Sequence, residues 1–398
     1  MMNRRQFLTS AAALAAATQA RADTLIGVTA KEIKIGQTMP YSGPASAYGV
    51  IGKTEAAYFK WLNEQGGVNG RMINLISLDD GYSPPKTVEQ TRRLVEQEKV
   101  AFLFNPLGTP CCLATRDYLN TNGVPQLFVA TGAAALSDPA HFKWTVGLQP
   151  NYQTESGIFG KHILATKPNA KIAVLYQNDG FGKDYLIGLK AGLGADHAGM
   201  IVKTATYETS EPTVDSQVTE LQGSGADVFL IAATPKFAAQ AIRKSFDLGW
   251  DATRYVTDVS LSIATVLKPA GLAKAKGLIT ANYGKDASDP RWKDDAGFKQ
   301  YKQFIDTRMS ARDLVDSNAI YGFNAAILMA HVLKQCGDDL SRANILKQAT
   351  NIDGLDLPML LPGIKINTSP TNYSPVRQMQ LQSFNGTSWE LFGDILQG

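Results

Sequence analysis

The chain has 398 residues, of which 44% are hydrophobic and 19% charged, so it can bury a large core and lacks the polar composition of a disordered chain. Its formal net charge of +3 matches the three arginines of an N-terminal stretch without acids, Arg4, Arg5 and Arg21, so the rest is neutral. A neutral body argues against nucleic acid as a partner. Beyond residue 22, no uncharged apolar stretch approaches the ~20 residues of a membrane-spanning helix.

The first 22 residues have the pattern of an export signal. The pair Arg4-Arg5 precedes a weakly apolar, alanine-rich segment, and Ala20-Arg21-Ala22 has the small-x-small pattern of a cleavage site. An ordinary N-terminal helix is the weaker alternative. We expect a signal peptide over 1–22, cleaved after Ala22, with export by the twin-arginine or the general secretory route and a periplasmic location.

Behind this segment, strand-like and helix-like stretches alternate. The apolar patterns predict strands at 33–36, 73–76, 101–104 and 126–129, separated by helices at 49–65, 85–98 and 111–121. Such alternation is typical of a parallel sheet covered by helices.

The alternation starts again after residue 150, which predicts a second sheet of the same kind. Expected helices lie near 153–165, 182–195, 214–223 and 236–248, and expected strands at 172–176, 201–205, 228–231, 254–257 and 278–280. Long helical segments follow at about 295–309 and 318–335. Residues 363–392 alternate like short antiparallel strands.

Motifs of catalysis are incomplete. Gly52-Lys53-Thr54 resembles the end of a phosphate-binding loop, but Ala47 stands where that loop needs glycine. Gly192-x-Gly194 lacks the third glycine of a dinucleotide fingerprint, and the four histidines are scattered without metal-ligand spacing. Cys111 opens a predicted helix, where a thiolate is stabilised, yet no partner base is identifiable. We therefore expect no catalytic residue, cofactor or metal, and an exported enzyme dependent on Cys111 stays the weaker alternative.

Two strand-to-helix turns are candidates for binding an anion. The first runs from Asn105 to Cys111 and contains Gly108 and the hydroxyl of Thr109; the second is the small-residue stretch 130–135. Free backbone N–H groups at such turns point toward a ligand, so together the two could bind one carboxylate. On these residues alone, two ordinary tight connections are an equal alternative.

A series of motifs in order resembles the leucine/isoleucine/valine-type substrate-binding proteins of ABC importers. The similarity covers almost the whole chain behind the export signal, and the Gly-Gly-Val-Asn-Gly-Arg stretch is its most specific part. It is carried by Pro-Tyr-Ser-Gly-Pro at 40–44, Gly49, Asn-Glu-Gln-Gly-Gly-Val-Asn-Gly-Arg at 63–71, Asp-Asp-Gly at 79–81, Gly-Val-Pro at 123–125, Tyr-Gln-Asn-Asp-Gly-Phe-Gly at 176–182 and the segment 238–249.

The resemblance implies a type I periplasmic-binding fold: α/β, with two doubly wound Rossmann-like lobes joined by a three-crossing hinge. With crossings near 149, 282 and 356, the N-terminal lobe would comprise 23–149 plus 283–355, and the C-terminal lobe 150–282 plus 356–398. Members bind a small molecule between closing lobes and deliver it, without chemistry. The implied partners are a small carboxylate-bearing ligand and the permease and ATPase complex at the inner membrane, with a monomeric receptor.

The same resemblance implies the ligand-binding residues. Thr109 matches the side chain that bonds the ligand carboxylate, beside Gly108, and Gly132, Ala133 and Ala134 match the second anion-binding turn. Tyr48 and Leu107 match the apolar wall. The remaining candidates around the ligand are Phe181, Thr234, Asp258 and Tyr321.

Several positions depart from the family pattern. The acidic residue that holds an amino acid's ammonium is matched by Val259, with Asp258 beside it, and Phe181 and Thr234 stand where tyrosine is frequent. An unpaired buried ammonium costs several kcal/mol, so the pocket should reject α-amino acids unless Asp258 turns inward. Tyr82 and Gly108 occupy the positions of the disulfide cysteines of the amino-acid binders.

We therefore expect capture of a branched-chain or other hydrophobic amino acid. The alternative is an aromatic carboxylate of the benzoate or hydroxycinnamate type, for which Tyr48, Phe181, Tyr283 and Tyr321 could line the pocket. A ligand-sensing regulator is a weaker third candidate.

Overall fold

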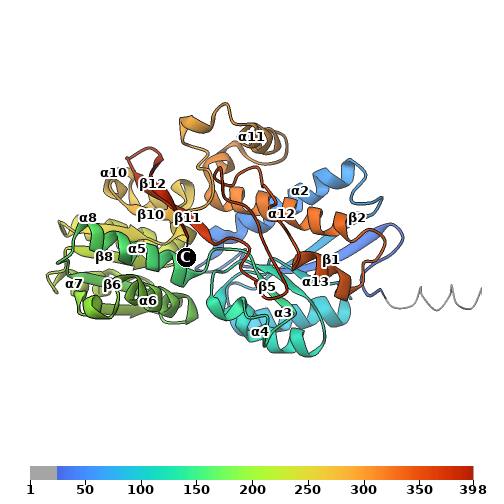
Figure 1. Cartoon of the computed structure of the whole chain (residues 1–398), viewed down its shortest axis with the longest axis horizontal. Helices are drawn as coiled ribbons and strands as arrows, with labels where there is room; N and C mark the ends of the chain where they lie inside the picture. Colours follow the sequence, from blue (N-terminus) through green and yellow to red (C-terminus); the bar gives the residue numbers. More distant parts are fainter. Residues whose placement is uncertain (1–24, 398) are drawn as a thin grey trace, which may run out of the picture.

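The computed structural model describes residues 25–397, so the predicted signal peptide and its cleavage site lie outside the described residues. Within this range no helix combines the length and the apolar character needed to cross a membrane. Two sheets with their covering helices form two lobes that lie side by side (Figure 1). This confirms the predicted two-lobe α/β fold.

Lobe 1 is built on a five-stranded parallel sheet with the order β2-β1-β3-β4-β5. Its strands are β1 (Glu32–Met39), β2 (Met72–Asp79), β3 (Leu103–Phe104), β4 (Gln126–Val129) and β5 (Thr145–Gly147). Its helices are α2 (Gly49–Glu64), α3 (Pro84–Arg92), α4 (Thr109–Thr121), α11 (Ala296–Arg308), α12 (Ser317–Gln335) and α13 (Arg342–Ala349).

Lobe 2 is built on a seven-stranded sheet with the order β12-β11-β10-β9-β8-β6-β7. Its strands are β6 (Ile172–Gln177), β7 (Ile201–Tyr207), β8 (Val228–Ala232), β9 (Thr253–Val256), β10 (Ile279–Asn282), β11 (Gln378–Phe384) and β12 (Trp389–Gln397). Its helices are α5 (Tyr152–Thr166), α6 (Gly180–Leu193), α7 (Asp215–Gln222), α8 (Pro235–Asp247), α9 (Lys268–Ala270) and α10 (Leu272–Ala275). Strands β6 to β10 are parallel, and β11 and β12 add an antiparallel hairpin.

Short 3-10 and π segments complete the described part of the chain at η1 (Ser46–Tyr48), η2 (Arg93–Gln97), η3 (Ala134–Leu136), η4 (Ala195–Met200), η5 (Asp258–Ser260), η6 (Ile263–Leu267), η7 (Pro290–Trp292) and η8 (Ala311–Val315).

The parallel strands of both lobes follow the doubly wound order 2-1-3-4-5, so each sheet has a switch point next to its first strand. In lobe 1 this point lies between β1 and β3, and in lobe 2 between β6 and β8. Loops after these strands are the expected place for a ligand.

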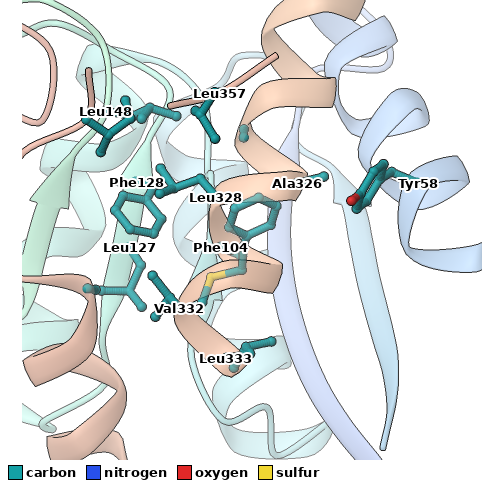
Figure 2. Packing of buried hydrophobic residues seen from close by; sticks show 14 of the residues in the cluster. Tyr58, Phe104, Leu127, Phe128, Leu148, Ala326, Leu328, Val332, Leu333 and Leu357 are labelled. Atoms are coloured by element: carbon teal, nitrogen blue, oxygen red, sulfur yellow. The ribbon is translucent and has the colours of Figure 1, made fainter. Parts of the chain in front are cut away.

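The third hinge crossing lies about twenty residues later in the structure than the sequence placed it. Residues 357–376 contribute Leu357, Leu361, Ile366 and Val376 to the buried core of lobe 1, and only at β11 does the chain join the sheet of lobe 2. Figure 2 shows Leu357 in this core. We accordingly assign 25–148 and 283–376 to lobe 1, and 150–282 and 378–397 to lobe 2. The sequence predicted short antiparallel strands over 363–392, but the strands of this region begin only at Gln378 of β11. An alternating apolar pattern does not indicate which of two cores a segment joins.

Helix α12 organises the core of lobe 1. It is buried on several faces, and its Leu328, Val332 and Leu333 belong to the same buried cluster as Phe104 and Phe128 of the sheet, all labelled in Figure 2. A helix that is apolar nearly all round must lie inside the protein. Because α12 is anchored in this way, its first turns hold a fixed position at the edge of the cleft between the lobes.

Candidate functional site

A cavity lies between the two lobes at the carboxyl ends of the parallel strands. About 90 Å³ of it is accessible to the centre of a water molecule, which is room for several waters or a small organic molecule. Loops after β3 of lobe 1 and after β6, β8 and β9 of lobe 2 contribute to its wall, as expected at the switch points of two open sheets. Its lining includes Tyr48, Ile51, Tyr82, Leu107, Gly108, Thr109, Ala130, Gln149, Tyr152, Phe181, Thr234, Asp258, Val259, Tyr283, Lys285, Asn318 and Tyr321.

The structure therefore brings together most of the predicted site residues. Tyr48, Leu107, Gly108, Thr109, Phe181, Thr234, Asp258 and Tyr321 all line the cavity.

The start of α4 forms the end of the cavity that suits an anion. Gly108 has a φ of +101°, which turns the chain from β3 into the helix, and Thr109 is the first helical residue. The first N–H groups of a helix have no acceptor within it, and the helix dipole favours negative charge there. The Thr109 hydroxyl lies 2.6 Å from the Thr131 hydroxyl, so the two side chains form one polar edge.

The second predicted anion-binding turn is arranged differently. Gly132, Ala133 and Ala134 are outside the cavity lining, and the Ala134 N–H donates to Asp184 Oδ2 of α6 at 2.9 Å. The Gly132 carbonyl accepts from the Tyr152 N–H at 2.9 Å. The turn faces lobe 2 rather than the cavity, so the chain's own carboxylate occupies the amide that the sequence assigned to a ligand.

Asp258 provides a buried carboxyl group on the opposite wall, which is hydrogen-bonded by Glu155, Thr257 and the Val259 N–H but has one oxygen without a partner. It stands at the start of η5, after β9, and is 9% exposed. Its Oδ1 is buried, and no group in residues 25–397 donates a hydrogen bond to it. A buried acceptor without a partner is costly, and this oxygen is available to a hydrogen-bond donor of a ligand in the cavity. Val259, the position matched to the family's acidic residue, also lines the cavity.

Glu155 of α5 lies directly behind Asp258. Its Oε1 accepts the Asp258 N–H at 2.8 Å, and its Oε2 accepts from the Tyr185 hydroxyl, which also contacts the hydroxyl of Thr257. Glu155 and Tyr185 are at most 1% exposed. These contacts hold the turn that carries Asp258 against α5 and α6.

The electrostatics of this carboxyl pair favour one bound cation. Burial raises the pKa of Asp258 to about 6. Burial and the charge of Asp258 raise the pKa of Glu155 well above its usual range, so near neutral pH the pair carries one negative charge, on Asp258. Among the described residues that line the cavity, Lys285 is the only lysine or arginine. Its Nζ is already paired with Asp295 Oδ1 at 2.6 Å.

Apolar and aromatic side chains form the rest of the wall. Tyr48, Ile51 and Leu107 belong to a buried cluster of lobe 1, with Tyr321 packed against it. The Tyr321 hydroxyl accepts from Asn105 Nδ2 at 2.8 Å. On lobe 2, Phe181 lies in the first turn of α6. This part of the cavity suits an apolar group of a ligand.

Thr234, the remaining predicted residue of lobe 2, is tied into its own lobe. Its N–H donates to the Tyr207 hydroxyl at 2.9 Å, and the Tyr207 hydroxyl donates to Gln177 Oε1 at 3.0 Å. Thr234 thus positions the wall through this network.

Sequence reasoning missed several residues of the wall. Tyr82, Tyr152 and Asn318 line the cavity, and Glu155 supports Asp258 from behind. Only Tyr82 had a signal, because it departs from the family pattern. The others come from distant helices whose faces are set by tertiary packing.

Direct hydrogen bonds link the lobes around the cavity. Besides the bond from Ala134 to Asp184, Ser262 Oγ of lobe 2 donates to Asp316 Oδ1, the N-cap of α12, at 2.9 Å. Gly180 at the start of α6 faces Thr109 so closely that a Cβ there would lie 3.1 Å from Thr109 Cγ2. The two lobes are therefore in contact across the cleft.

The thiol next to the anion-binding end is unsuited to nucleophilic catalysis. Burial, with the charge of Asp80, raises the pKa of Cys111 far above its usual range. Its side chain is fully buried, and a thiol in this environment stays protonated. Across residues 25–397, no group of three or more histidine, cysteine, aspartate or glutamate side chains is placed to hold a metal ion.

Known proteins share this architecture. Residues 32–388 match the family model described as periplasmic binding protein. The Leu/Ile/Val-binding protein homolog 2 of Brucella abortus is 24% identical over 321 residues, which are 78% of this chain and 84% of that protein. The crystal structure of a branched-chain amino acid ABC transporter from Thermus thermophilus with bound valine matches with a TM-score of 0.83 and 15% identity, over 93% of this chain and 98% of that one. The solute-binding protein of an ABC transporter from R. palustris, in complex with benzoate, matches with a TM-score of 0.77 and 20% identity, over 92% and 98%.

Proposed function

Because the chain belongs to the periplasmic binding protein family, we propose that it is the receptor of an ABC importer and captures an amino acid with an apolar side chain between its lobes. The observation that carries this proposal is the buried carboxylate of Asp258, with an Oδ1 that lacks a partner, in the same cavity as the start of α4. One end suits a cation and the other an anion, which is the charge pattern of an amino-acid zwitterion.

The ligand carboxylate binds at the start of α4 in this proposal. The Thr109 hydroxyl, supported by Thr131 at 2.6 Å, donates to it. In the first helical turn Pro110 has no N–H and the Cys112 N–H donates to the Gly108 carbonyl, so the N–H groups of Thr109 and Cys111 add to the attraction. Gly132, Ala133 and Ala134 are assigned no direct contact, because the Ala134 amide is already bonded to Asp184.

The ligand ammonium binds Asp258. It supplies the donor that Oδ1 lacks and the positive charge that the carboxyl pair lacks. Glu155 retains its proton and holds the turn in place. The side chain of the ligand lies against Tyr48, Leu107 and Tyr321.

Capture works by closure of the lobes. The anion-binding end belongs to lobe 1 and Asp258 to lobe 2, so both contacts form together only in the closed state. A ligand that binds the closed state better shifts the hinge equilibrium toward it. The protein delivers its ligand to a permease and ATPase complex at the inner membrane, acts as a monomer in the periplasm and catalyses no reaction.

Ligand-induced thermal stabilisation tests the assignment. Residues 23–398 are screened against leucine, isoleucine, valine and phenylalanine, beside benzoate, 4-hydroxybenzoate and coumarate. Binding at 100 times Kd stabilises the native state by about 2.7 kcal/mol, which the assay detects. We expect the amino acids to stabilise the protein and the acids without an amine to leave it unchanged. Stabilisation by the aromatic acids alone overturns the amino-acid assignment in favour of an aromatic carboxylate.

A further inference from the structure

Tyr82 has an unusual backbone at the edge of the cleft. It lies between β2 and α3, and its φ is +60°, in the left-handed region that bulky side chains rarely adopt. Asp80 maintains this conformation: its Oδ1 accepts the Tyr82 N–H at 2.9 Å, and its Oδ2 accepts from the Thr87 hydroxyl at 2.8 Å. Outliers of this kind persist where the surroundings enforce them, and they cluster at functional sites.

A glycine on the neighbouring loop makes room for the Tyr82 ring. A Cβ on Gly108 would lie 2.6 Å from Tyr82 Cε2, so the ring fills the space that any side chain at 108 would take. Tyr82 is 7% exposed and forms part of the cavity wall beside Leu107. The ring therefore takes up volume next to the place where the ligand's apolar group is proposed to lie.

The hydroxyl of Tyr82 reaches the other lobe. It lies 3.5 Å from Gln177 Nε2, at the outer limit of a hydrogen bond. Gln177 is fixed within lobe 2, because its Nε2 donates to Asp179 Oδ2 at 2.6 Å and its Oε1 accepts from Tyr207 at 3.0 Å. Asp179 also caps α6 through the Phe181 N–H. Tyr82 thus joins the cavity wall of lobe 1 to a rigid network of lobe 2.

We propose that Tyr82 is a specificity-determining residue of this cleft: its ring limits the size of the ligand's apolar group, and its hydroxyl couples ligand capture to closure through Gln177. The proposal rests on the proposed function, since it assumes a small ligand in this cavity. The two roles separate by substitution, because phenylalanine removes only the hydroxyl while alanine also removes the ring.

Affinities for a small and a large ligand test both roles. Calorimetric Kd values for valine and phenylalanine are measured for the wild type, Tyr82→Phe, Tyr82→Ala and Tyr58→Phe. Tyr58 is the matched control, because it is also 7% exposed and belongs to lobe 1 but packs against Phe304 and Phe323 in the core. Loss of one hydrogen bond should weaken both ligands by a common factor of roughly 2 to 10 in Tyr82→Phe. In Tyr82→Ala the preference should move toward phenylalanine by about tenfold or more, because the ring's volume becomes available.

A purely structural role predicts other results. Tyr82→Phe would then match Tyr58→Phe, and Tyr82→Ala would weaken both ligands equally, which overturns the proposal. Should Tyr82→Ala fail to fold, Tyr82→Leu gives the same comparison with less lost volume. If the wild type binds benzoate and no amino acid, the proposed function fails, and the ratio of benzoate to naphthoate affinities then tests Tyr82 by the same criterion.

Discussion

Replacing Asp258 by asparagine separates the two ligand classes that this cavity could take. The substitution keeps the side chain's shape and removes the charge that is proposed to bind the ligand ammonium. Leaving one member of a buried, hydrogen-bonded charge pair without its partner costs about 2–5 kcal/mol. The affinity for a hydrophobic amino acid should therefore fall roughly 30- to 5,000-fold.

The same substitution should stabilise the protein without ligand. The pKa of Asp258 rises from 3.8 to about 6 on burial, so the folded state binds this proton more tightly than the unfolded chain does. Protonation of Asp258 therefore stabilises the folded protein fully below about pH 4, and this stabilisation is lost as the pH rises through 6. At neutral pH the buried charge destabilises the folded state by about 3 kcal/mol relative to its protonated form. Asparagine carries no charge, so Asp258→Asn should have the higher melting temperature at pH 7.5.

Calorimetry with an amino acid and thermal unfolding without ligand test the two expectations together. Asp251→Asn is the control, because this exposed aspartate of lobe 2 undergoes the same change of charge. Amino-acid affinity within about threefold of the wild type would refute the role of Asp258. If the wild type binds no amino acid and Asp258→Asn binds benzoate more tightly than the wild type does, the ligand is an aromatic carboxylate that the charge of Asp258 repels.

Three further outcomes follow from the geometry. Amino-acid affinity should fall about tenfold between pH 7.5 and pH 5, because Asp258 gains a proton near pH 6; an affinity that rises on acidification in calorimetry would contradict an ammonium contact. Thr109→Val should weaken binding roughly 10- to 150-fold, since a hydrogen bond to a charged group contributes about 1.5–3 kcal/mol; equilibrium dialysis against Thr121→Val, at the far end of α4, measures the difference. Gly180→Val places side-chain atoms against Thr109 Cγ2, so it should hold the lobes apart and lower the affinity for every ligand by a similar factor. X-ray scattering should give a larger radius of gyration, and an unchanged radius would show that the closed state tolerates the side chain.

Part of this architecture was predictable because it depends on local patterns. Alternating apolar segments set the order of strands and helices, and the doubly wound sheets follow from that order. The turn before α4 was recognisable because glycine, threonine and proline follow a buried strand, and Thr109 indeed lines the cavity. The strand β5 and the helix α13 were not predicted. Strand β5 has only three residues, and α13 buries only two apolar side chains, so neither shows a clear periodicity in the sequence.

Only the tertiary structure decided how the site is completed. Whether the carboxylate of Asp258 faces the cavity depends on the turn at η5, which Glu155 holds from α5, about a hundred residues away in the chain. The sequence offered the amide of Ala134 to a ligand, but the folded chain places Asp184 there. Leu357, Leu361, Ile366 and Val376 join the buried core of lobe 1, although the strands that follow them in the chain belong to lobe 2. Local sequence determines which groups are available, whereas long-range packing determines which of them remain unpaired and able to bind.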